Sequence, residues 1–144
     1  MSELYETDVV LWADQQAALL RRRAANELDW NNLAEEIEDV GNRYRDRIES
    51  RLATLSAHLL KWQFQPERQS GSWRGSIVES RNRIHQVTEN YPSLREYPQK
   101  VLAKAYKAGR RVAAAETELT ELPAECPWTL EQILDHDFWP DDRG

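Results

Sequence analysis

The chain has 144 residues, of which 40% are hydrophobic and 31% charged, and its formal net charge is −6 at pH 7. Six Trp, five Tyr and two Phe exclude a disordered chain, because such chains lack large apolar groups to bury. The one cysteine excludes an intramolecular disulfide and a cysteine-based zinc site. This length predicts a single domain over residues 1–144, with an ordered core at about residues 5–140, and the scarcity of Gly and Pro beside abundant Ala, Leu, Glu and Arg favours a helical one.

Hydropathy and charge order give the first indications of compartment and partners. The longest apolar run, Val9 to Ala13, is far shorter than the roughly 20 residues that span a bilayer. No signal peptide is visible, so we expect a cytoplasmic location and no membrane partner. Acidic residues predominate before residue 43 and after residue 115, and basic residues predominate between them. The acidic ends either fold against the basic centre or leave it as a face for an anionic partner, while the overall acidity disfavours non-specific nucleic-acid binding.

A first helix is predicted from a Thr7 or Asp8 cap to about Ala25. The arginines near its end suit the negative end of the helix dipole. Its apolar side should consist of Val9, Trp12, Ala13, Leu19 and Leu20.

The second helix is predicted to run from about Trp30 to about Phe64, with Asp29 as its N-cap. Apolar residues recur there in steps of three or four without a break, which is the period of an amphipathic helix. We therefore expect this long helix to form the spine of the fold. Its stripe consists of Trp30, Leu33, Ile37, Val40, Tyr44, Ile48, Leu52, Leu55, Leu59 and Trp62.

A third helix should follow a loop at residues 65–72. Pro66 disfavours helix at the residue before it, and Gly71 marks the turn. Ser70 or Ser72 can cap the new helix, which should reach about Asn90. Its apolar stripe contains Trp73, Ile77, Ile84, Val87 and Tyr91, with Arg81 at a position inside it.

Two further helices complete the prediction. One should run from about Pro98 to Glu118, and a short one from a Thr129 cap to about Leu134. No segment alternates as a β-strand does, so the predicted fold class is all-α: a compact bundle of four main helices plus a short C-terminal helix. The segment Phe138-Trp139-Pro140 should pack back as an apolar anchor. The small residues that permit close helix contact in the fourth helix are Ala105, Ala108, Gly109 and Ala113.

His58 is the main candidate for chemistry. It lies on the flank of the long helix, at the border of the apolar stripe. Arg74 and Arg81 of the following helix are expected to face the same flank. One interpretation is a solvated rim or a structural seam, in which arginine stems cover core residues. The other is an anion- or phosphate-binding pocket with tryptophan walls, in which desolvation among arginines keeps His58 neutral as a general base. The candidate polar site therefore consists of His58, Arg74, Arg81, Arg51, Trp62 and Trp73.

No metal site and no cofactor are expected. Glu36, in the acidic cluster of the long helix, and His58 are about 33 Å apart along a straight helix, too far to share one ion. His136 stands between two aspartates in a C-terminal turn, where solvation is the simpler interpretation. The chain contains no Gly-rich phosphate loop, GxSxG, HExxH or EF-hand spacing. No enzyme class is indicated.

Four segments carry a family resemblance: YETDVVLWADQQAALLR, NLAEEIEDVG, HLLKWQFQPERQSGSWRGSIVESR and CPWTLEQILDHDFW. Together they resemble a bacterial family catalogued as "domain of unknown function 29", and the match covers Tyr5 to Pro140. Val9-Val10 departs from the more aromatic pair expected there, which affects packing and not the assignment. The resemblance implies a small cytosolic all-helical protein, with His58, Trp62, Arg74 and the PWTLEQ stretch in the family pattern. It implies no activity, cofactor or catalytic residue.

Two functions are compatible with these observations. The favoured one is a non-catalytic interaction module whose partner is a second copy, through the long helix, or another protein. The alternative is the anion-binding pocket, with or without catalysis, around His58, Arg74 and Arg81.

Overall fold

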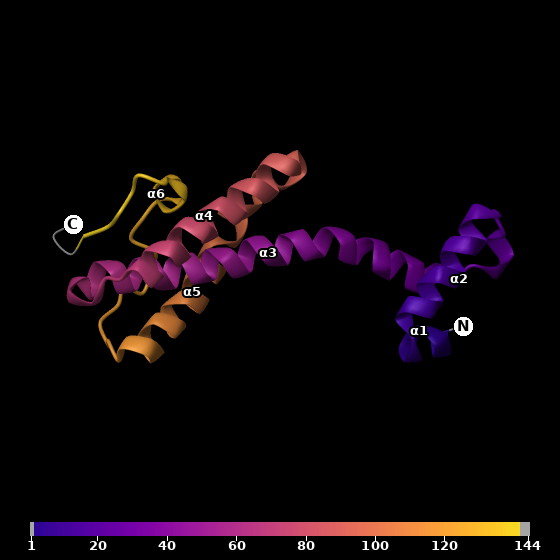
Figure 1. Cartoon of the computed structure of the whole chain (residues 1–144), viewed down its shortest axis with the longest axis horizontal. Helices are drawn as coiled ribbons and strands as arrows, with labels where there is room; N and C mark the ends of the chain where they lie inside the picture. Colours follow the sequence, from indigo (N-terminus) through magenta and orange to yellow (C-terminus); the bar gives the residue numbers. More distant parts are fainter. Residues whose placement is uncertain (1, 142–144) are drawn as a thin grey trace. The chain divides into compact units, whose positions relative to one another are not determined.

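The computed structural model describes residues 2–141 and contains only helices and connecting segments within that range (Figure 1). The predicted all-α class, with four main helices and a short C-terminal one, is confirmed. A six-residue helix near the N-terminus and three short 3-10 helices were not predicted. The elements are α1 (Ser2–Thr7), α2 (Val9–Arg21), η1 (Ala25–Glu27), α3 (Trp30–Phe64), η2 (Pro66–Arg68), α4 (Gly71–Asn90), η3 (Pro92–Leu94), α5 (Tyr97–Thr117) and α6 (Leu130–Leu134).

Residue contacts divide the chain into two compact units, Met1–Arg43 and Tyr44–Gly144, and α3 contributes to both. The N-terminal unit contains α1, α2, η1 and the first turns of α3. The C-terminal unit contains the rest of α3 with α4, α5 and α6. One cooperative domain remains a prediction.

Side-chain caps define where the helices begin. Asp8 accepts a hydrogen bond from the backbone N–H of Leu11 at 3.0 Å, and Ser70 accepts one from that of Trp73 at 3.2 Å. The predicted capping box of α6 is also present at Thr129. These short polar side chains satisfy backbone donors that have no partner inside the helix. The predicted bounds of α3 are confirmed, and those of α4, α5 and α6 are correct to within about one residue.

The prediction for the end of the first helix was wrong. α2 stops at Arg21, because Arg23 adopts a left-handed backbone conformation with φ of 58° that cannot continue a right-handed helix. Its predicted apolar side is also only partly buried: Trp12 is buried, whereas Val9 and Leu20 are exposed.

Hydrogen bonds join α2 to the start of α3 in the N-terminal unit. The carboxylate of Asp29 accepts from the Asn32 side-chain amide at 2.8 Å and from the Trp12 indole N–H at 3.0 Å, and these bonds lower the pKa of Asp29. The Gln16 side chain accepts from the backbone N–H of Asp29 at 2.9 Å. Tyr5 in α1 donates to Glu36 at 2.6 Å, which raises the pKa of Tyr5 to about 12. Asp29 stands directly before α3, as predicted for its N-cap.

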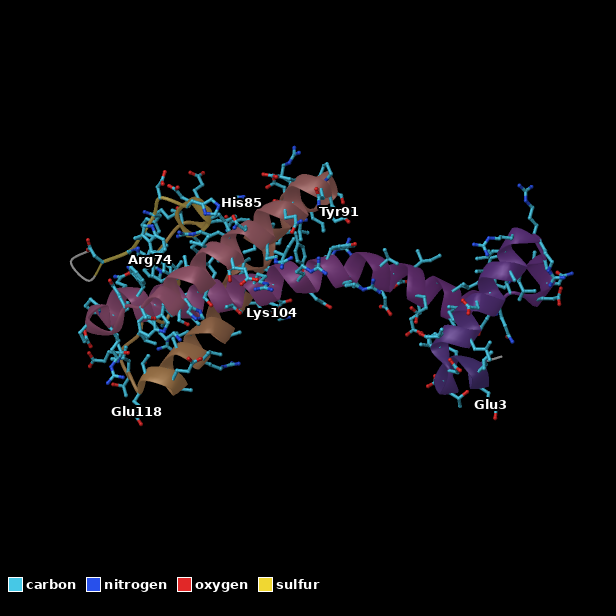
Figure 2. All side chains as sticks on the ribbon, viewed as in Figure 1. Glu3, Arg74, His85, Tyr91, Lys104 and Glu118 are labelled. Carbon is cyan, nitrogen blue, oxygen red and sulfur yellow. The ribbon has the colours of Figure 1, made fainter. Side chains whose placement is uncertain are left out.

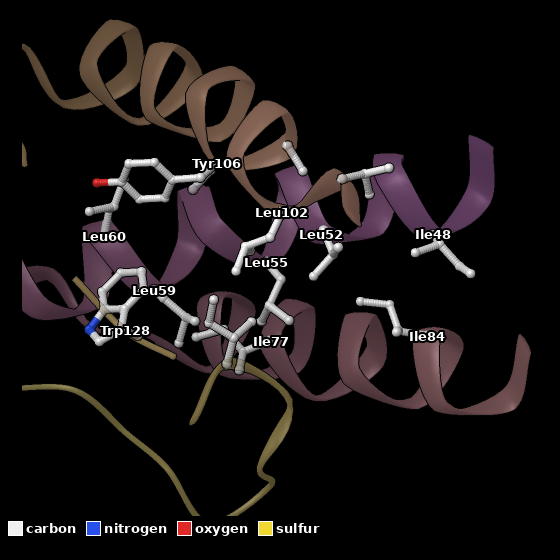
Figure 3. Packing of buried hydrophobic residues seen from close by; sticks show 14 of the residues in the cluster. Ile48, Leu52, Leu55, Leu59, Leu60, Ile77, Ile84, Leu102, Tyr106 and Trp128 are labelled. Atoms are coloured by element: carbon white, nitrogen blue, oxygen red, sulfur yellow. The ribbon is translucent and has the colours of Figure 1, made fainter. Parts of the chain in front are cut away.

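The C-terminal unit has an apolar core around the second half of α3 (Figure 3). Here the side chains of the predicted stripe point between α4 and α5, and those from Ile48 to Leu59 are completely buried. Burying a Leu or Ile side chain contributes about 1.5–3 kcal/mol, so this layer supplies much of the stability of the unit. The fully buried residues from these helices include Ile48, Leu52, Leu55, Leu59, Ile77, Ile84 and Tyr106.

α5 approaches the backbone of α3 at Gly109. A Cβ atom at this position would lie 2.4 Å from the carbonyl oxygen of Ala53 and 2.9 Å from the Cβ of Ser56. Three of the four small residues predicted for such a contact, Ala105, Gly109 and Ala113, are buried. Ala108 is exposed and takes no part in it.

The apolar stripe of α3 is not buried along its whole length. Trp30, Ile37 and Val40 are 62%, 69% and 53% exposed, whereas every stripe residue from Ile48 onward is buried. The pattern predicted a continuous amphipathic face, and the structure covers only its second half.

Candidate functional site

The predicted polar residues lie in separate groups within the C-terminal unit. Trp62, Arg74 and Arg81 gather around Trp139 of the C-terminal segment, and we call these four residues the tryptophan–arginine cluster. Arg74 lies near the start of α4 in Figure 2. The remaining three predicted residues, His58, Arg51 and Trp73, have other partners.

Arg81 holds the C-terminal segment against α4. Its side chain is fully buried, and its Nε and Nη2 atoms donate to the carbonyl oxygens of Ile133 at 2.7 Å and Phe138 at 2.8 Å. The Trp139 ring centroid lies 5.4 Å from its guanidinium carbon. Burial lowers the pKa of Arg81, and the nearby negative charge of Asp135 opposes that shift. These contacts correspond to the structural seam, one of the two interpretations of this residue.

Arg74 contacts the same aromatic rings from an exposed position. Its guanidinium carbon is 5.5 Å from the ring centroid of Trp62 and 5.7 Å from that of Trp139, and the two rings are 4.9 Å apart. Cation–π contacts of this kind contribute about 0.5–1 kcal/mol at exposed sites. A surface cavity of about 350 Å³ adjoins the cluster and is lined by Trp128, Phe138 and Trp139 among others. The predicted anchor Phe138-Trp139-Pro140 does pack against the core.

His58 lies in a second group that includes two residues absent from the predicted site. Its Nδ1 atom is 2.8 Å from the carbonyl oxygen of Thr54, which makes that nitrogen the donor. Lys61 is buried, donates to Glu116 of α5 at 2.8 Å and lies 5.1 Å from the ring centroid of Trp73. This ion pair joins α3 to α5.

The pKa of His58 is lowered in the folded chain, and its cationic neighbour is Lys61 in place of the arginines expected from the sequence. Burial is the main cause; the bond to Thr54 opposes it, and the neighbouring positive charge comes from Lys61. Hydrogen bonding to Lys61 lowers the pKa of Glu116. With Nδ1 donating to Thr54, the other ring nitrogen of the neutral His58 is an acceptor and can take up a proton. In the sequence, Lys61 is a charged residue inside the apolar run of residues 59–62, and this was the signal that could have identified it.

The other polar residues form weaker arrangements. Arg51 reaches Glu79 of α4 at 4.0 Å, and both side chains are substantially exposed, so this pair adds little stability. The rings of His85 and His136 have centroids 5.6 Å apart, and the His85 Nε2 atom is 2.8 Å from the Leu134 carbonyl oxygen. Among residues 2–141, no three His, Cys, Asp or Glu side chains group as metal ligands do.

The most exposed apolar surface lies in the N-terminal unit. Trp30, Ile37 and Val40 recur at helical spacing and form what we call the α3 apolar face. The Trp30 ring is oriented by a hydrogen bond from its indole N–H to the carbonyl oxygen of Ala25 at 3.1 Å. Val10 and Leu11 of α2, in the same unit, are also exposed. The sequence showed the apolar stripe, but the part without cover became visible only in the structure.

Comparison with known proteins leaves function open but settles the family. Within the described part of the chain, no helix is both long and apolar enough to cross a membrane. Neither the curated proteins nor the solved structures yield a match to the chain. The family model described as "Domain of unknown function DUF29" matches residues 4–139. The chain therefore belongs to the DUF29 family.

Proposed function

We propose that this protein is a non-catalytic interaction module that binds another protein chain through the α3 apolar face. The supporting observation is the exposure of Trp30 and Ile37, at 62% and 69%, on a helix whose continuing stripe is buried. Single exposed apolar residues are normal on protein surfaces, but several at helical spacing on one face mark an interaction site. An amphipathic face of this kind accepts a second helix or an apolar groove.

The orientation of Trp30 supports the same proposal. Tryptophan is enriched among residues that dominate binding energy, and a ring already held in place loses little conformational entropy on binding. The hydrogen bond to Ala25 restricts the Trp30 ring while leaving most of it accessible. The N-terminal unit therefore presents a preorganised apolar side chain.

Site-specific photo-crosslinking in cells tests this proposal. A benzoyl-phenylalanine at position 37 should give a recurrent covalent adduct with one identified protein, which Trp30→Ala should reduce. Position 112 provides the matched control, because Val112 is also exposed on a helix, at 47%, but lies in the C-terminal unit. Equal crosslinking from positions 37 and 112, or none from position 37, would reject the α3 apolar face as a binding surface.

The anion-binding pocket remains the second candidate, and the exposure of Arg74 beside two tryptophan rings favours it. Arg81 contributes less than the sequence suggested, because two of its nitrogens already donate to backbone carbonyls. Titration with inorganic phosphate and pyrophosphate, followed by tryptophan fluorescence, tests this function. A saturable signal that Arg74→Ala removes would support it, and an unchanged signal in the variant would reject Arg74 as the ligand.

We place this activity in the cytoplasm. Cys126 is a free thiol in a chain that has no second cysteine for an intramolecular disulfide, which suits a reducing compartment. Fractionation of cells that express the chain checks the location, and recovery in a membrane or extracellular fraction would contradict it.

A further inference from the structure

Together with Leu33, the α3 apolar face has the spacing of a coiled-coil seam. Trp30, Leu33, Ile37 and Val40 are separated by three, four and three residues, which is the alternation of the two core positions of a heptad. Leu33 is half-buried, whereas Ile37 and Val40 are 69% and 53% exposed. The seam is therefore suited to one additional helix.

The positions that flank this seam are charged on one side and small on the other. Glu36 and Arg43 occupy equivalent flanking positions one heptad apart, and Ala34 and Gly41 occupy those on the opposite side. Small residues let two helix backbones approach closely, and charges beside a seam select the partner and its direction. Glu36 is already oriented by the 2.6 Å hydrogen bond from Tyr5, and a carboxylate can accept further hydrogen bonds.

We propose that the partner on this face is a second copy of the same chain, paired antiparallel over residues 34–43; this rests on the function proposed above. The two-fold axis passes between Glu38 and Asp39. Ile37 of each chain packs against Val40 of the second copy, and each Glu36 forms an ion pair with Arg43 of the second copy. The same face thus serves both chains, as a two-fold interface requires.

The charges favour the antiparallel direction over the parallel one. In a parallel pair, each flanking residue meets the position five residues further along the other chain, so Glu36 faces Gly41 and Arg43 faces Ile48. Neither contact is an ion pair, and Ile48 is fully buried within its own C-terminal unit. The antiparallel arrangement satisfies both charges twice, because the two-fold axis generates two identical Glu36–Arg43 pairs.

Sedimentation of the full chain and of two charge variants tests this arrangement. The unmodified chain should show a monomer–dimer equilibrium, and Ile37→Asp should abolish the dimer. Glu36→Lys and Arg43→Glu should each weaken self-association about 10- to 100-fold, because each places like charges opposite each other twice. An equimolar mixture of the two variants should dimerise again. In that mixed dimer the lysine introduced at position 36 faces the glutamate introduced at position 43, while the native Arg43 faces the native Glu36.

The double variant Glu36→Lys/Arg43→Glu exchanges the two charges in every chain, so two identical copies can again form opposite-charge pairs across the interface. Because it also lacks the hydrogen bond from Tyr5 to Glu36, its dimerisation would show that loss of this bond does not explain the effect of Glu36→Lys. Circular dichroism checks that each variant keeps its helix content. A chain that stays monomeric up to millimolar concentration overturns the second-copy proposal. The antiparallel pairing is overturned if Arg43→Glu leaves the dimer unaffected. It is also overturned if neither the mixture nor the double variant restores the dimer. In each case a crosslink from position 37 to a different protein would leave the broader interaction function intact.

Discussion

Arg81 illustrates how one buried cation can determine the position of a whole segment. Its guanidinium donates to two carbonyl oxygens, those of Ile133 and Phe138, on either side of a C-terminal turn. A carbonyl that is buried without a partner costs about 1–3 kcal/mol, so the side chain matters through the groups it satisfies. Arginine reaches the two carbonyls from two different nitrogens of one rigid planar group, whereas lysine offers a single nitrogen on a flexible stem.

Replacing Arg81 should therefore destabilise the C-terminal segment more than replacing Arg74. We expect Arg81→Ala to lower the free energy of unfolding by about 2–4 kcal/mol and to expose Trp139, seen as a red shift of tryptophan emission. Arg74→Ala is the matched control, because it removes only exposed cation–π contacts worth about 0.5–1 kcal/mol. Urea unfolding measures both. Equal losses in the two variants would show that the carbonyl contacts of Arg81 do not support the segment.

The stability of the chain should depend on pH through His58. Burial lowers the pKa of His58 below its ordinary value of 6.5 in the folded chain, so below that pH the unfolded chain binds more protons. The free energy of unfolding should consequently fall as the pH is lowered from about 7.5 to 5.5. His58→Gln should remove that part of the slope, and His136→Gln, which changes an exposed histidine, should retain it. Identical slopes in both variants would contradict the burial argument.

The ion pair beside His58 should respond at lower pH. Hydrogen bonding to Lys61 lowers the pKa of Glu116 from 4.5, so its contribution is present above that pH and is lost on further acidification. The histidine and carboxylate effects can therefore be separated in one titration.

At the level of helices, α3 and α5 are held at a distance set by the absence of a side chain at Gly109. Glycine in a helix interior is unfavourable by about 1 kcal/mol relative to alanine, so its presence indicates a packing requirement. The 2.4 Å approach of a Cβ to the backbone carbonyl of Ala53 identifies that requirement, because backbone cannot move aside as a flexible side chain can.

Gly109 and Gly75 form a matched pair for testing this contact. Gly109→Ala should destabilise the chain by about 1–3 kcal/mol, since the extra methyl group forces the helices apart. Gly75→Ala should stabilise it by up to about 1 kcal/mol, because Gly75 lies inside α4 with nothing within 4 Å of its Cβ position. Thermal unfolding by circular dichroism should give shifts of opposite sign. Two shifts of the same sign would show that the close approach at Gly109 does not limit packing.

The helices were predictable from the sequence because their signals are local. Ser70 and Thr129 cap the next few backbone N–H groups, and the stripe of α3 follows directly from the helical period. The candidate site was less predictable because it depends on pairing between helices. Lys61 and Glu116 meet across α3 and α5, 55 residues apart in sequence, and no local pattern marks them as partners. Periodicity likewise shows that a face is apolar but not which part of it is covered, as at Ile37.

At the level of the whole chain, the two units differ in how much apolar surface they bury. The N-terminal unit encloses few residues, chiefly Trp12, Gln16, Leu28 and Asp29, whereas the C-terminal unit contains the extended core around α3. A small core supports little stability by itself, and helices gain most of theirs from packing. A second copy on the exposed seam, as proposed above, would add apolar burial to this smaller core.

Hydrogen exchange on the full chain tests this difference. Amides at residues 30–43 should exchange faster than those at residues 48–62 of the same helix, because opening of the smaller unit exposes less apolar surface. Raising the protein concentration should slow exchange at residues 30–43 as the second copy binds, and Arg43→Glu should remove that dependence. Amides at residues 105–113 of α5 are the internal control, because they lie in the C-terminal unit and should not respond. Equal protection along all of α3 at every concentration would instead support the single cooperative domain predicted from chain length, and would contradict a separate opening of the N-terminal unit.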